Sequence, residues 1–504
     1  MKRNVVLLGI DGADWAFLDD WIESGAMPNI AALVKNGVRA PLDSVMPLNS
    51  AAAWVSIITG RSPGGHGIFG FTRCGQGGYV RRPVSTDDIG AATLWDAVNA
   101  AGEPLGVVNC PITYPPPELD GFAISGILVS HNDLWAHPPE LEAELRGLFG
   151  PYMVDVAWAL VDDAGPGERE KFLADMYLMA RKQEEVALKC MATRPWSVLA
   201  VFFTGTDRIM HRLWHYIDRR HPLHDSDAAK IFGDEIRKYY VLIDDIIGRI
   251  LEKAGDASVI VASDHGFGAL YHRFYLRRWL AERDYLVEDA SIESVETDEA
   301  LCGIDLSASK TFPASLSESG LWINLKGRQA QGMVDANEYD ELRVRIIREL
   351  EGFEAEDGSK PVKRAVRRED VLAGPFVDEA PDILIEPNDL FIVDDAPSEE
   401  VIKLSMRETG THRPSGIFMA SGPGFERGAT LSRLNSVDIL PTLLAAAGLP
   451  VPEGIEGRVV EEAFDEPPRV IHSPPISPRR QRKKPDSLEE DKKKKNLLKG
   501  LGYL

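Results

Sequence analysis

Short runs of consecutive apolar residues recur along the chain, separated by longer segments in which apolar residues repeat at helical spacing. The apolar runs are bounded by turn residues and do not alternate apolar with polar positions. This pattern is typical of strands that are buried on both faces of a sheet. The runs are Val5–Ile10, Leu105–Val108, Val198–Phe203, Val259–Ala262, Ile383–Ile385 and Ile417–Ala420.

Helical patterns lie between these runs. They cover Ala51–Ile58, Thr93–Ala101, Glu168–Cys190, Ala228–Ala254, Glu338–Leu350 and Asn435–Ala447. Strands that alternate with helices predict an α/β fold with a mostly parallel central sheet and helices on both of its faces.

Two stretches depart from this alternation. From about Gly268 to Glu408 the chain is mixed, polar and turn-rich, so we expect a smaller inserted subdomain within a main domain of residues 1–465. Residues 466–504 are rich in proline, lysine and arginine, which favours a disordered, basic C-terminal tail. The last residues, 496–504, hold enough apolar positions for a short docking element.

The charge of the chain is divided unevenly. The net charge of the 504 residues is −22, yet residues 469–504 hold 11 Lys or Arg and four Asp or Glu, a net charge of +7. The rest therefore carries −29, which argues against non-specific nucleic-acid binding. An acidic body suits an anionic substrate only where bound metal ions invert the local field. The basic tail is either solvated or a contact for an acidic partner, and nothing indicates an oligomeric state.

The spacing of the cysteines and the hydropathy of the chain indicate the compartment in which the protein is found. The four cysteines, Cys74, Cys110, Cys190 and Cys302, show no paired spacing, which argues against a disulfide framework and fits a reducing compartment. The apolar run Val5–Ile10 is six residues long and ends at an aspartate, so it does not predict a signal peptide. No stretch reaches the roughly 18–20 apolar residues of a membrane span. We expect a cytoplasmic protein without a transmembrane segment.

Acidic and histidine residues follow three of the predicted core strands. Asp11 comes directly after the first run, Asp207 follows Val198–Phe203 with His211 four residues later, and Asp264 with His265 follows Val259–Ala262. The i, i+4 spacing places Asp207 and His211 on one face of a helix. Each aspartate could instead cap a neighbouring helix. Because open α/β sheets place their sites at the carboxyl ends of the strands, we expect the three motifs to meet at one edge.

Two further residues complete a candidate site. Ser50 precedes the helical pattern that Gly60 ends, so it is either a helix cap or a nucleophile for a phosphoryl group bound by free helix N–H groups. His412 stands before the last apolar run and is either structural or a ligand. Carboxylate and imidazole suit zinc and similar divalent ions. Three Asp, three His and one Ser are enough for two adjacent metal ions.

The order and context of these motifs resemble the alkaline phosphatase superfamily, in particular its nucleotide pyrophosphatase/phosphodiesterase-like branch. The resemblance runs from Val5 to about Val459 and is most specific in PLNSAAAWVSIITG (Pro47–Gly60), the SPGGHGIFGF that follows it, and ASDHGFG (Ala262–Gly268). The segments Leu321–Val334 and Asp438–Arg458 resemble those of bacterial proteins described as predicted phosphohydrolases or phosphomutases of the superfamily.

The resemblance implies two metal sites and a mechanism. It assigns one divalent ion to Asp207, His211 and His412, and a second to Asp11, Asp264, His265 and the oxygen of Ser50. Zinc is the usual metal in the superfamily, with manganese or another divalent ion as alternatives. Ser50 would attack the phosphorus in line to give a phosphoseryl intermediate, which water then hydrolyses.

One position departs from the family pattern. Phe71 stands where nucleotide pyrophosphatases carry an asparagine that binds phosphoryl oxygens, which leaves Asn49 as a candidate donor. We predict a metal-dependent hydrolase of small phosphorylated substrates that prefers a phosphodiester or a phosphoanhydride to a monoester. The alternatives are a phosphomutase on the same core, or a catalytically silent binding or scaffold protein that uses its basic tail.

Overall fold

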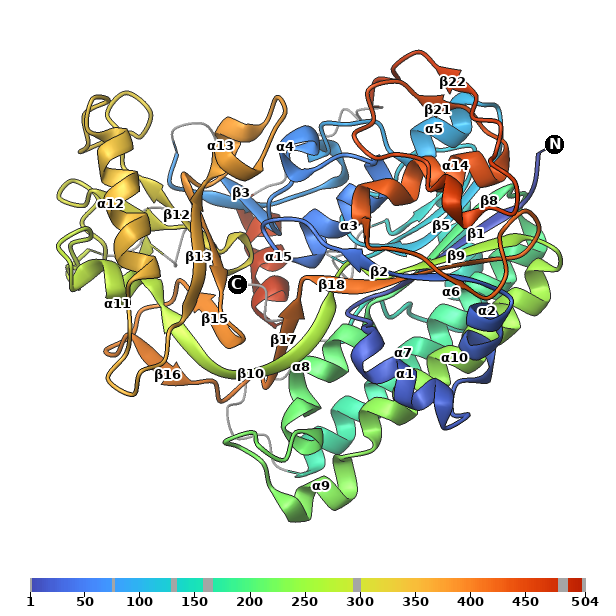
Figure 1. The fold of residues 1–504 in the computed structure, drawn as a ribbon, viewed down its shortest axis with the longest axis horizontal. Coiled ribbons are helices and arrows are strands. Elements are labelled where there is room, and N and C mark those ends of the chain that lie inside the picture. The colour runs from blue at the N-terminus through green and yellow to red at the C-terminus, as the bar shows by residue number, and fades with distance from the viewer. Residues whose placement is uncertain are drawn as a thin grey trace.

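The computed structural model describes residues 2–74, 78–127, 134–156, 166–292, 301–478 and 488–500 (Figure 1). Its centre is a ten-stranded sheet in the order β19-β2-β18-β9-β1-β8-β5-β6-β7, with β20 beside β2. The strands are β1 (Val5–Ile10), β2 (Gly37–Asp43), β5 (Leu105–Cys110), β6 (Gly121–Ser125), β7 (Ala136–His137), β8 (Val198–Phe203), β9 (Ser258–Ala262), β18 (Ser415–Ser421), β19 (Ala429–Thr430) and β20 (Leu434–Asn435). Its central pairs, β9-β1-β8-β5-β6, are parallel, while β18 and β7 join antiparallel. The predicted α/β fold with a mostly parallel sheet is confirmed.

Helices cover both faces of this sheet (Figure 1). They are α1 (Trp15–Glu23), α2 (Pro28–Lys35), α3 (Ser50–Thr59), α4 (Pro63–His66), α5 (Leu94–Ala100), α6 (Pro139–Phe149), α7 (Pro166–Thr193), α8 (Gly205–Ile217), α9 (Ser226–Phe232), α10 (Glu235–Ala254) and α14 (Ile439–Ala447). One face packs against α3, α5 and α14. The other packs against α2, α7, α8 and α10.

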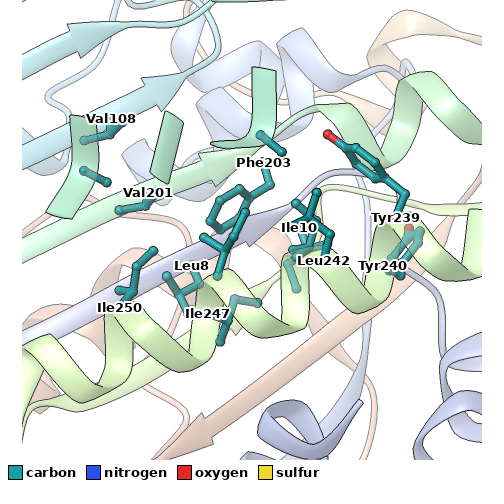
Figure 2. Close-up of a cluster of buried hydrophobic side chains, with 14 of the residues drawn as sticks. Leu8, Ile10, Val108, Val201, Phe203, Tyr239, Tyr240, Leu242, Ile247 and Ile250 are labelled. Carbon is teal, nitrogen blue, oxygen red and sulfur yellow. The ribbon is translucent and has the colours of Figure 1, made fainter. Parts of the chain in front are cut away.

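The first strand shows why its sequence is continuously apolar. Val5 and Leu7 pack into the core on one face, whereas Val6, Leu8 and Ile10 pack into the core on the other. Figure 2 shows the second core, where Leu8 and Ile10 lie beside side chains of α10. A strand that is buried on both faces leaves no position for a polar residue until it ends, at Asp11.

A second unit with its own core lies between β9 and β18 in the chain. The long strand β10 (Gly266–Tyr275) leads from the main sheet into it (Figure 1). It contains β11 (Thr311–Pro313), β12 (Gly320–Ile323), β13 (Val362–Arg367), β14 (Ile383–Pro387), β15 (Leu390–Asp394), β16 (Ile402–Leu404), α11 (Leu276–Ala281), α12 (Tyr339–Glu351) and α13 (Arg368–Val371). These strands form two four-stranded sheets, one of which includes β17 (Gly410–Arg413) paired with β10. Nearly all buried residues of its apolar core come from positions 274–393. The subdomain bounds of 268–408 stay a prediction.

Two predicted elements differ from the observed ones. The helical pattern Ala228–Ala254 forms two helices, α9 and α10, because α9 ends at Gly233. The apolar run Ile383–Ile385 forms β14, which belongs to the antiparallel sheet of the second unit and not to the central sheet. Its burial comes from the second core, and burial alone does not tell a sequence which sheet a strand joins.

The C-terminal tail has structure in its described parts, where disorder was expected. Strand β22 (His472–Ser473) pairs with β21 (Val451–Pro452), and Leu488–Gly500 forms helix α15. Leu498 is fully buried in the core that α3, α5 and α14 share. A docking element thus exists near the C-terminus, although it begins before residue 496. The basic run Arg479–Lys484 lies outside the described residues.

Two small strands, β3 (Thr72–Cys74) and β4 (Arg81–Pro83), form a hairpin-like pair beyond α4. Across the described ranges, no helix is both long and apolar enough to cross a membrane. The cytoplasmic location stays a prediction.

Candidate metal and nucleophile site

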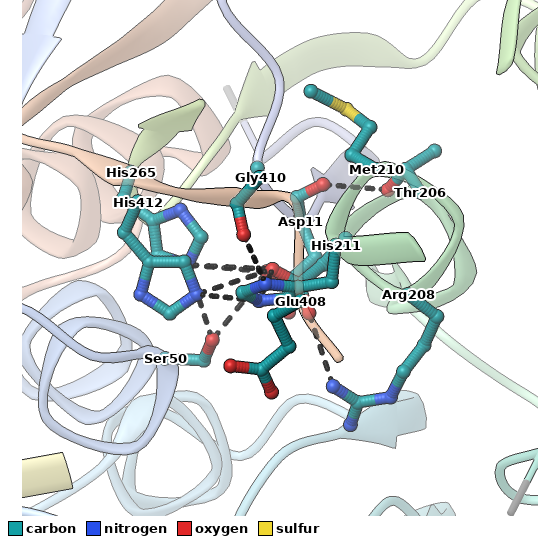
Figure 3. Close-up of polar contacts among 12 residues, drawn as sticks. Asp11, Ser50, Thr206, Arg208, Met210, His211, His265, Glu408, Gly410 and His412 are labelled. Atoms are coloured by element: carbon teal, nitrogen blue, oxygen red, sulfur yellow. Dashed lines mark hydrogen bonds and ion pairs between the residues drawn. The ribbon is translucent and has the colours of Figure 1, made fainter. Parts of the chain in front are cut away.

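The three central strands β8, β1 and β9 are neighbours and parallel, so their carboxyl ends lie together. Asp11 follows β1, Asp264 follows β9, and α8 begins just after β8 and carries Asp207 and His211. His412 belongs to β17, where it lies opposite Phe267 of β10. The structure therefore brings the predicted Asp and His ligands to one edge of the sheet, where Figure 3 labels Asp11, His211, His265 and His412.

The six residues form two groups. The Asp207 cluster comprises Asp207, His211 and His412, and the Asp11 cluster comprises Asp11, Asp264 and His265. In each, one potential ligand atom from every residue lies within 4.8 Å of the others. The clusters adjoin, because His265 Nε2 is 4.0 Å from Asp207 Oδ1. These are the two ligand sets that the family resemblance implied, apart from the Ser50 oxygen.

Two carboxylate oxygens in these clusters are buried without a hydrogen bond. Asp207 Oδ1 lies 3.2 Å from His211 Nε2 and 3.3 Å from His412 Nε2, yet none of these contacts has hydrogen-bond geometry. Asp264 Oδ2 is likewise buried without a hydrogen bond, although it lies 3.2 Å from His265 Nε2. A buried acceptor without a donor is costly. A cation bound among these atoms would satisfy it, so the donor set fits divalent metal ions.

The charges of the Asp11 cluster are not balanced within the protein. Burial raises the pKa of Asp11 well above its ordinary range, and the nearby charges of Asp264 and Asp207 raise it further. Burial and the charge of Asp207 likewise raise the pKa of Asp264 to about 8. Repulsion among buried carboxylates is what a bound cation relieves.

The Asp207 cluster differs because imidazoles surround its carboxylate. Burial alone would raise the pKa of Asp207, but the adjacent imidazoles of His211 and His412 lower it well below its ordinary value. The same pairing outweighs burial at His211 and raises its pKa. Burial and the neighbouring His265 lower the pKa of His412 to about 3.

Ser50 is the first residue of α3 and is fully buried beside the Asp11 cluster. Its Oγ lies 3.2 Å from His265 Nε2 and 3.5 Å from Asp11 Oδ1 (Figure 3). Helix geometry leaves the N–H groups of Ser50 and Ala51 without an intrahelical acceptor. They are candidate donors to a phosphoryl oxygen. Gly60, at φ 63°, ends the helix as the sequence predicted.

Asn49 has a different role from the one that the sequence suggested. Its Oδ1 accepts from Ala52 N–H at 2.9 Å and caps α3. Its amide nitrogen donates to Phe69 O at 2.9 Å and to Ser317 O at 2.8 Å. Both amide hydrogens are thereby occupied, which argues against Asn49 as a phosphoryl donor. It caps α3 and leaves Ser50 free of that task.

Two residues that support the clusters were not found from the sequence. Trp54 Nε1 donates to Asp11 Oδ2 at 3.0 Å, and Arg208 Nη1 donates to Asp207 Oδ2 at 3.0 Å. Arg208 is 1% exposed and also donates to Asp155, at 2.8 Å from Nη2. Trp54 lies four residues after Ser50, a spacing that could have indicated a shared helix face. No sequence signal links Asp155 to the site.

A cleft of about 470 Å³ opens at His211 and His412. One side is formed by residues 43–46, 48 and 49, before Ser50, and the other by residues of β13, β14 and β15 in the second unit. A substrate that reaches the clusters through this cleft contacts both units of the chain.

The chain is similar to a known enzyme family and to several solved structures. The profile of the family described as type I phosphodiesterase / nucleotide pyrophosphatase matches residues 5–415. No curated protein matches the chain. Among solved structures, phosphonoacetate hydrolase from Sinorhizobium meliloti 1021, in complex with phosphonoacetate, is similar at 16% identity over 88% of this chain and 96% of that one, with a TM-score of 0.58. Human ectonucleotide pyrophosphatase / phosphodiesterase 5 is similar at 14% identity over 92% and 100% of the two chains, with a TM-score of 0.51. At such identities the structural likeness shows the fold alone.

Proposed function

The chain belongs to the type I phosphodiesterase / nucleotide pyrophosphatase family and is a hydrolase of phosphoric ester bonds, and from this premise we propose that Ser50 is its nucleophile. The substrate is a small phosphate ester, with a diester or a phosphoanhydride preferred to a monoester. The observation that carries the proposal is the position of Ser50 Oγ, at a helix N-terminus and within 3.5 Å of Asp11 and His265.

Two divalent ions would be held by the Asp207 cluster and by the Asp11 cluster, the latter together with Ser50. Zinc suits the mixture of carboxylate and imidazole, and manganese is the alternative. When bound, such ions neutralise charge on the phosphoryl group and lower the pKa of a hydroxyl or water.

The chain's own groups account for the rest of the reaction. Ser50 Oγ forms a bond to phosphorus as the bond to the leaving oxygen breaks, which gives a phosphoseryl intermediate. The N–H groups at the start of α3 donate to the phosphoryl oxygens. Water then attacks the phosphoseryl phosphorus and releases Ser50. A monoester has one more negatively charged oxygen than a diester and needs another hydrogen-bond donor. The side-chain amide of Asn49 already donates to two backbone carbonyls and cannot fill that role, which favours the diester.

The test is hydrolysis of nitrophenyl phosphate monoesters, diesters, phosphonates and sulfates with zinc or manganese. We expect Ser50→Ala to lower turnover by at least about 10³-fold while the protein stays folded, since Asn49 and not Ser50 caps α3. Acid quenching during turnover should trap phosphate on Ser50 in the wild type. The matched control is Ser62→Ala at the N-cap of α4, where the side chain makes no capping bond.

Wild-type turnover in Ser50→Ala would overturn the nucleophile. An isomerised phosphosugar with no released phosphate would instead indicate a phosphomutase. A folded protein that takes up no divalent metal on reconstitution would favour the scaffold alternative.

A further inference from the structure

The cleft beside the metal clusters has a predominantly apolar wall. Val45, Met46 and Leu48 line it from the segment that precedes Ser50, and all three side chains are half-buried. Ile392, which is also half-buried, lines it from β15 of the second unit, next to the covered side chain of Ile385 in β14. Large apolar side chains that converge on one concave surface indicate a ligand that is itself apolar there.

The cations of the cleft are already matched by carboxylates. Lys363 Nζ lies 2.7 Å from Glu386 Oε1, and Arg364 Nη2 lies 3.1 Å from Glu386 Oε2. Arg413 Nε lies 3.6 Å from Asp389 Oδ1. Every Lys or Arg among the described lining residues therefore lies beside a carboxylate, with Glu386 shared by Lys363 and Arg364.

Glu408, an acidic residue that lines the cleft, is also paired with an oppositely charged side chain. Glu408, which lines the cleft next to His211, pairs with Arg273 at 2.6 Å. A second phosphate or carboxylate on the substrate would have to compete with these carboxylates for their cations. Like charges brought together in this way oppose binding.

Aromatic surface for a nucleobase is also scarce. Apart from the two histidines of the Asp207 cluster, the only aromatic side chain among the described lining residues is Phe391, which is 6% exposed. A ring that is covered by its own protein offers little face for stacking. The cleft therefore lacks both features that a nucleotide or polyphosphate substituent requires.

From the apolar wall and the matched charges, we propose that the substrate carries a neutral, predominantly apolar alkyl or aryl substituent on its phosphoryl group, and that this substituent occupies the cleft. The inference rests on the phosphohydrolase function proposed above. It narrows that function from phosphodiesters or phosphoanhydrides to diesters of apolar alcohols.

The test is a series of p-nitrophenyl phosphodiesters that differ only in the second substituent: methyl, hexyl, phenyl, 5-carboxypentyl and thymidine-5′. With zinc- or manganese-loaded protein, we expect kcat/KM for the hexyl and phenyl esters to exceed that of the methyl ester about tenfold or more, because apolar groups fill an apolar pocket. The carboxypentyl ester should fall below the hexyl ester by a similar factor, and the thymidine ester should not exceed the methyl ester.

A carboxypentyl or thymidine ester that equals or exceeds the hexyl ester would overturn the inference, while the proposed function would stand. Failure to hydrolyse any diester of the series would overturn this inference, and the proposed function would fall with it only if the monoester and phosphonate of the first panel were also left intact. Because the series uses the wild-type protein, it decides the question even if a variant fails to fold.

A substitution in the cleft tests whether the preference for apolar esters arises there. Ile392→Lys adds an unmatched cation to the wall, so the ratio of hexyl to carboxypentyl kcat/KM should fall about tenfold. The matched control is Val344→Lys, which adds the same charge on the exposed side of α12 in the same unit, where Val344 is 45% exposed. An Ile392→Lys ratio equal to that of the control would overturn the placement of the substituent.

Discussion

The two metal clusters adjoin each other but are built in different ways. The Asp11 cluster comes from turns directly after the adjacent parallel strands β1 and β9, and its three side chains are completely buried. The Asp207 cluster comes from α8 and β17, and its histidine side chains keep 11% and 13% of their surface exposed, at the mouth of the cleft. One cluster is thus enclosed beside Ser50, and the other is open to substrate and water.

The difference extends to charge. The Asp11 cluster sets two carboxylates against one imidazole, and both carboxylates have raised pKa values. The Asp207 cluster sets one carboxylate against two imidazoles and Arg208, and the pKa of that carboxylate is lowered. The Asp11 cluster thus leaves two carboxylates in mutual repulsion, whereas imidazoles and a guanidinium surround the carboxylate of Asp207.

The largest expected effect comes from removing one ligand of each cluster in turn. Asp264→Asn and His412→Gln should each lower turnover by at least about 10³-fold, since each removes part of a two-ion site. Elemental analysis should show that either variant loses the ion of its own cluster and keeps the other. If one substitution empties both clusters, they form a single coupled site and the comparison fails.

The next effect is a pH dependence of the metal-free protein. Asp264 has a pKa of about 8 when folded, above its ordinary value of 3.8, so the folded chain binds more protons than the unfolded chain between these values. The free energy of unfolding should therefore be highest below about pH 4 and should fall as the pH rises toward 8, on the order of 1.4 kcal/mol per pH unit for one such group. Urea titrations of chelator-treated protein measure this.

Variants of the two clusters should respond differently. Asp264→Asn should reduce the slope between pH 4 and 8. Asp207→Asn should keep most of that slope but end it at a lower pH, because burial, the larger cause of the raised pKa of Asp264, remains while the charge of Asp207 is lost. Equal slopes in wild type and Asp264→Asn would contradict the assigned charge imbalance.

A smaller effect is expected at Arg208. Arg208→Lys keeps the charge but removes the planar fork that joins Asp207 to Asp155. Competition with a chelator should show that one ion binds about 10- to 100-fold more weakly. Arg212→Lys, four residues along the same helix, is the control. Identical affinities in the two variants would show that Arg208 does not orient Asp207.

The smallest effect is expected at Trp54. Trp54→Phe removes one hydrogen bond from an uncharged donor to the Asp11 carboxylate but keeps a ring to pack against Phe202, whose centroid is 4.9 Å away. A hydrogen bond to a charged group is worth about 1.5–3 kcal/mol, and a bound cation would share the charge of Asp11, so affinity for the second ion should fall about tenfold. If Trp54→Phe lowered metal affinity more than Arg208→Lys does, the residues around the Asp11 cluster would support their ion more strongly than those around the Asp207 cluster, contrary to this expectation.

Much of the site was predictable because buried strands end where polar residues begin. The apolar runs before Asp11 and Asp264 fixed both residues at strand ends, and the i, i+4 spacing of Asp207 and His211 fixed their shared helix face. The capping role of Asn49 was not predictable. It depends on carbonyl groups of residues 69 and 317, which approach it only in the folded chain.

The α/β class, the positions of the strand-end aspartates and the start of α3 follow from the sequence alone, because burial and helix capping are encoded by neighbouring residues. Tertiary structure alone decided that His412 joins Asp207, since that contact depends on the pairing of β17 with β10. It likewise decided that Asp155 supports Arg208 and that β14 joins the second sheet. Contacts between residues far apart in the chain follow from sheet order and register, which local patterns of hydrophobicity do not contain.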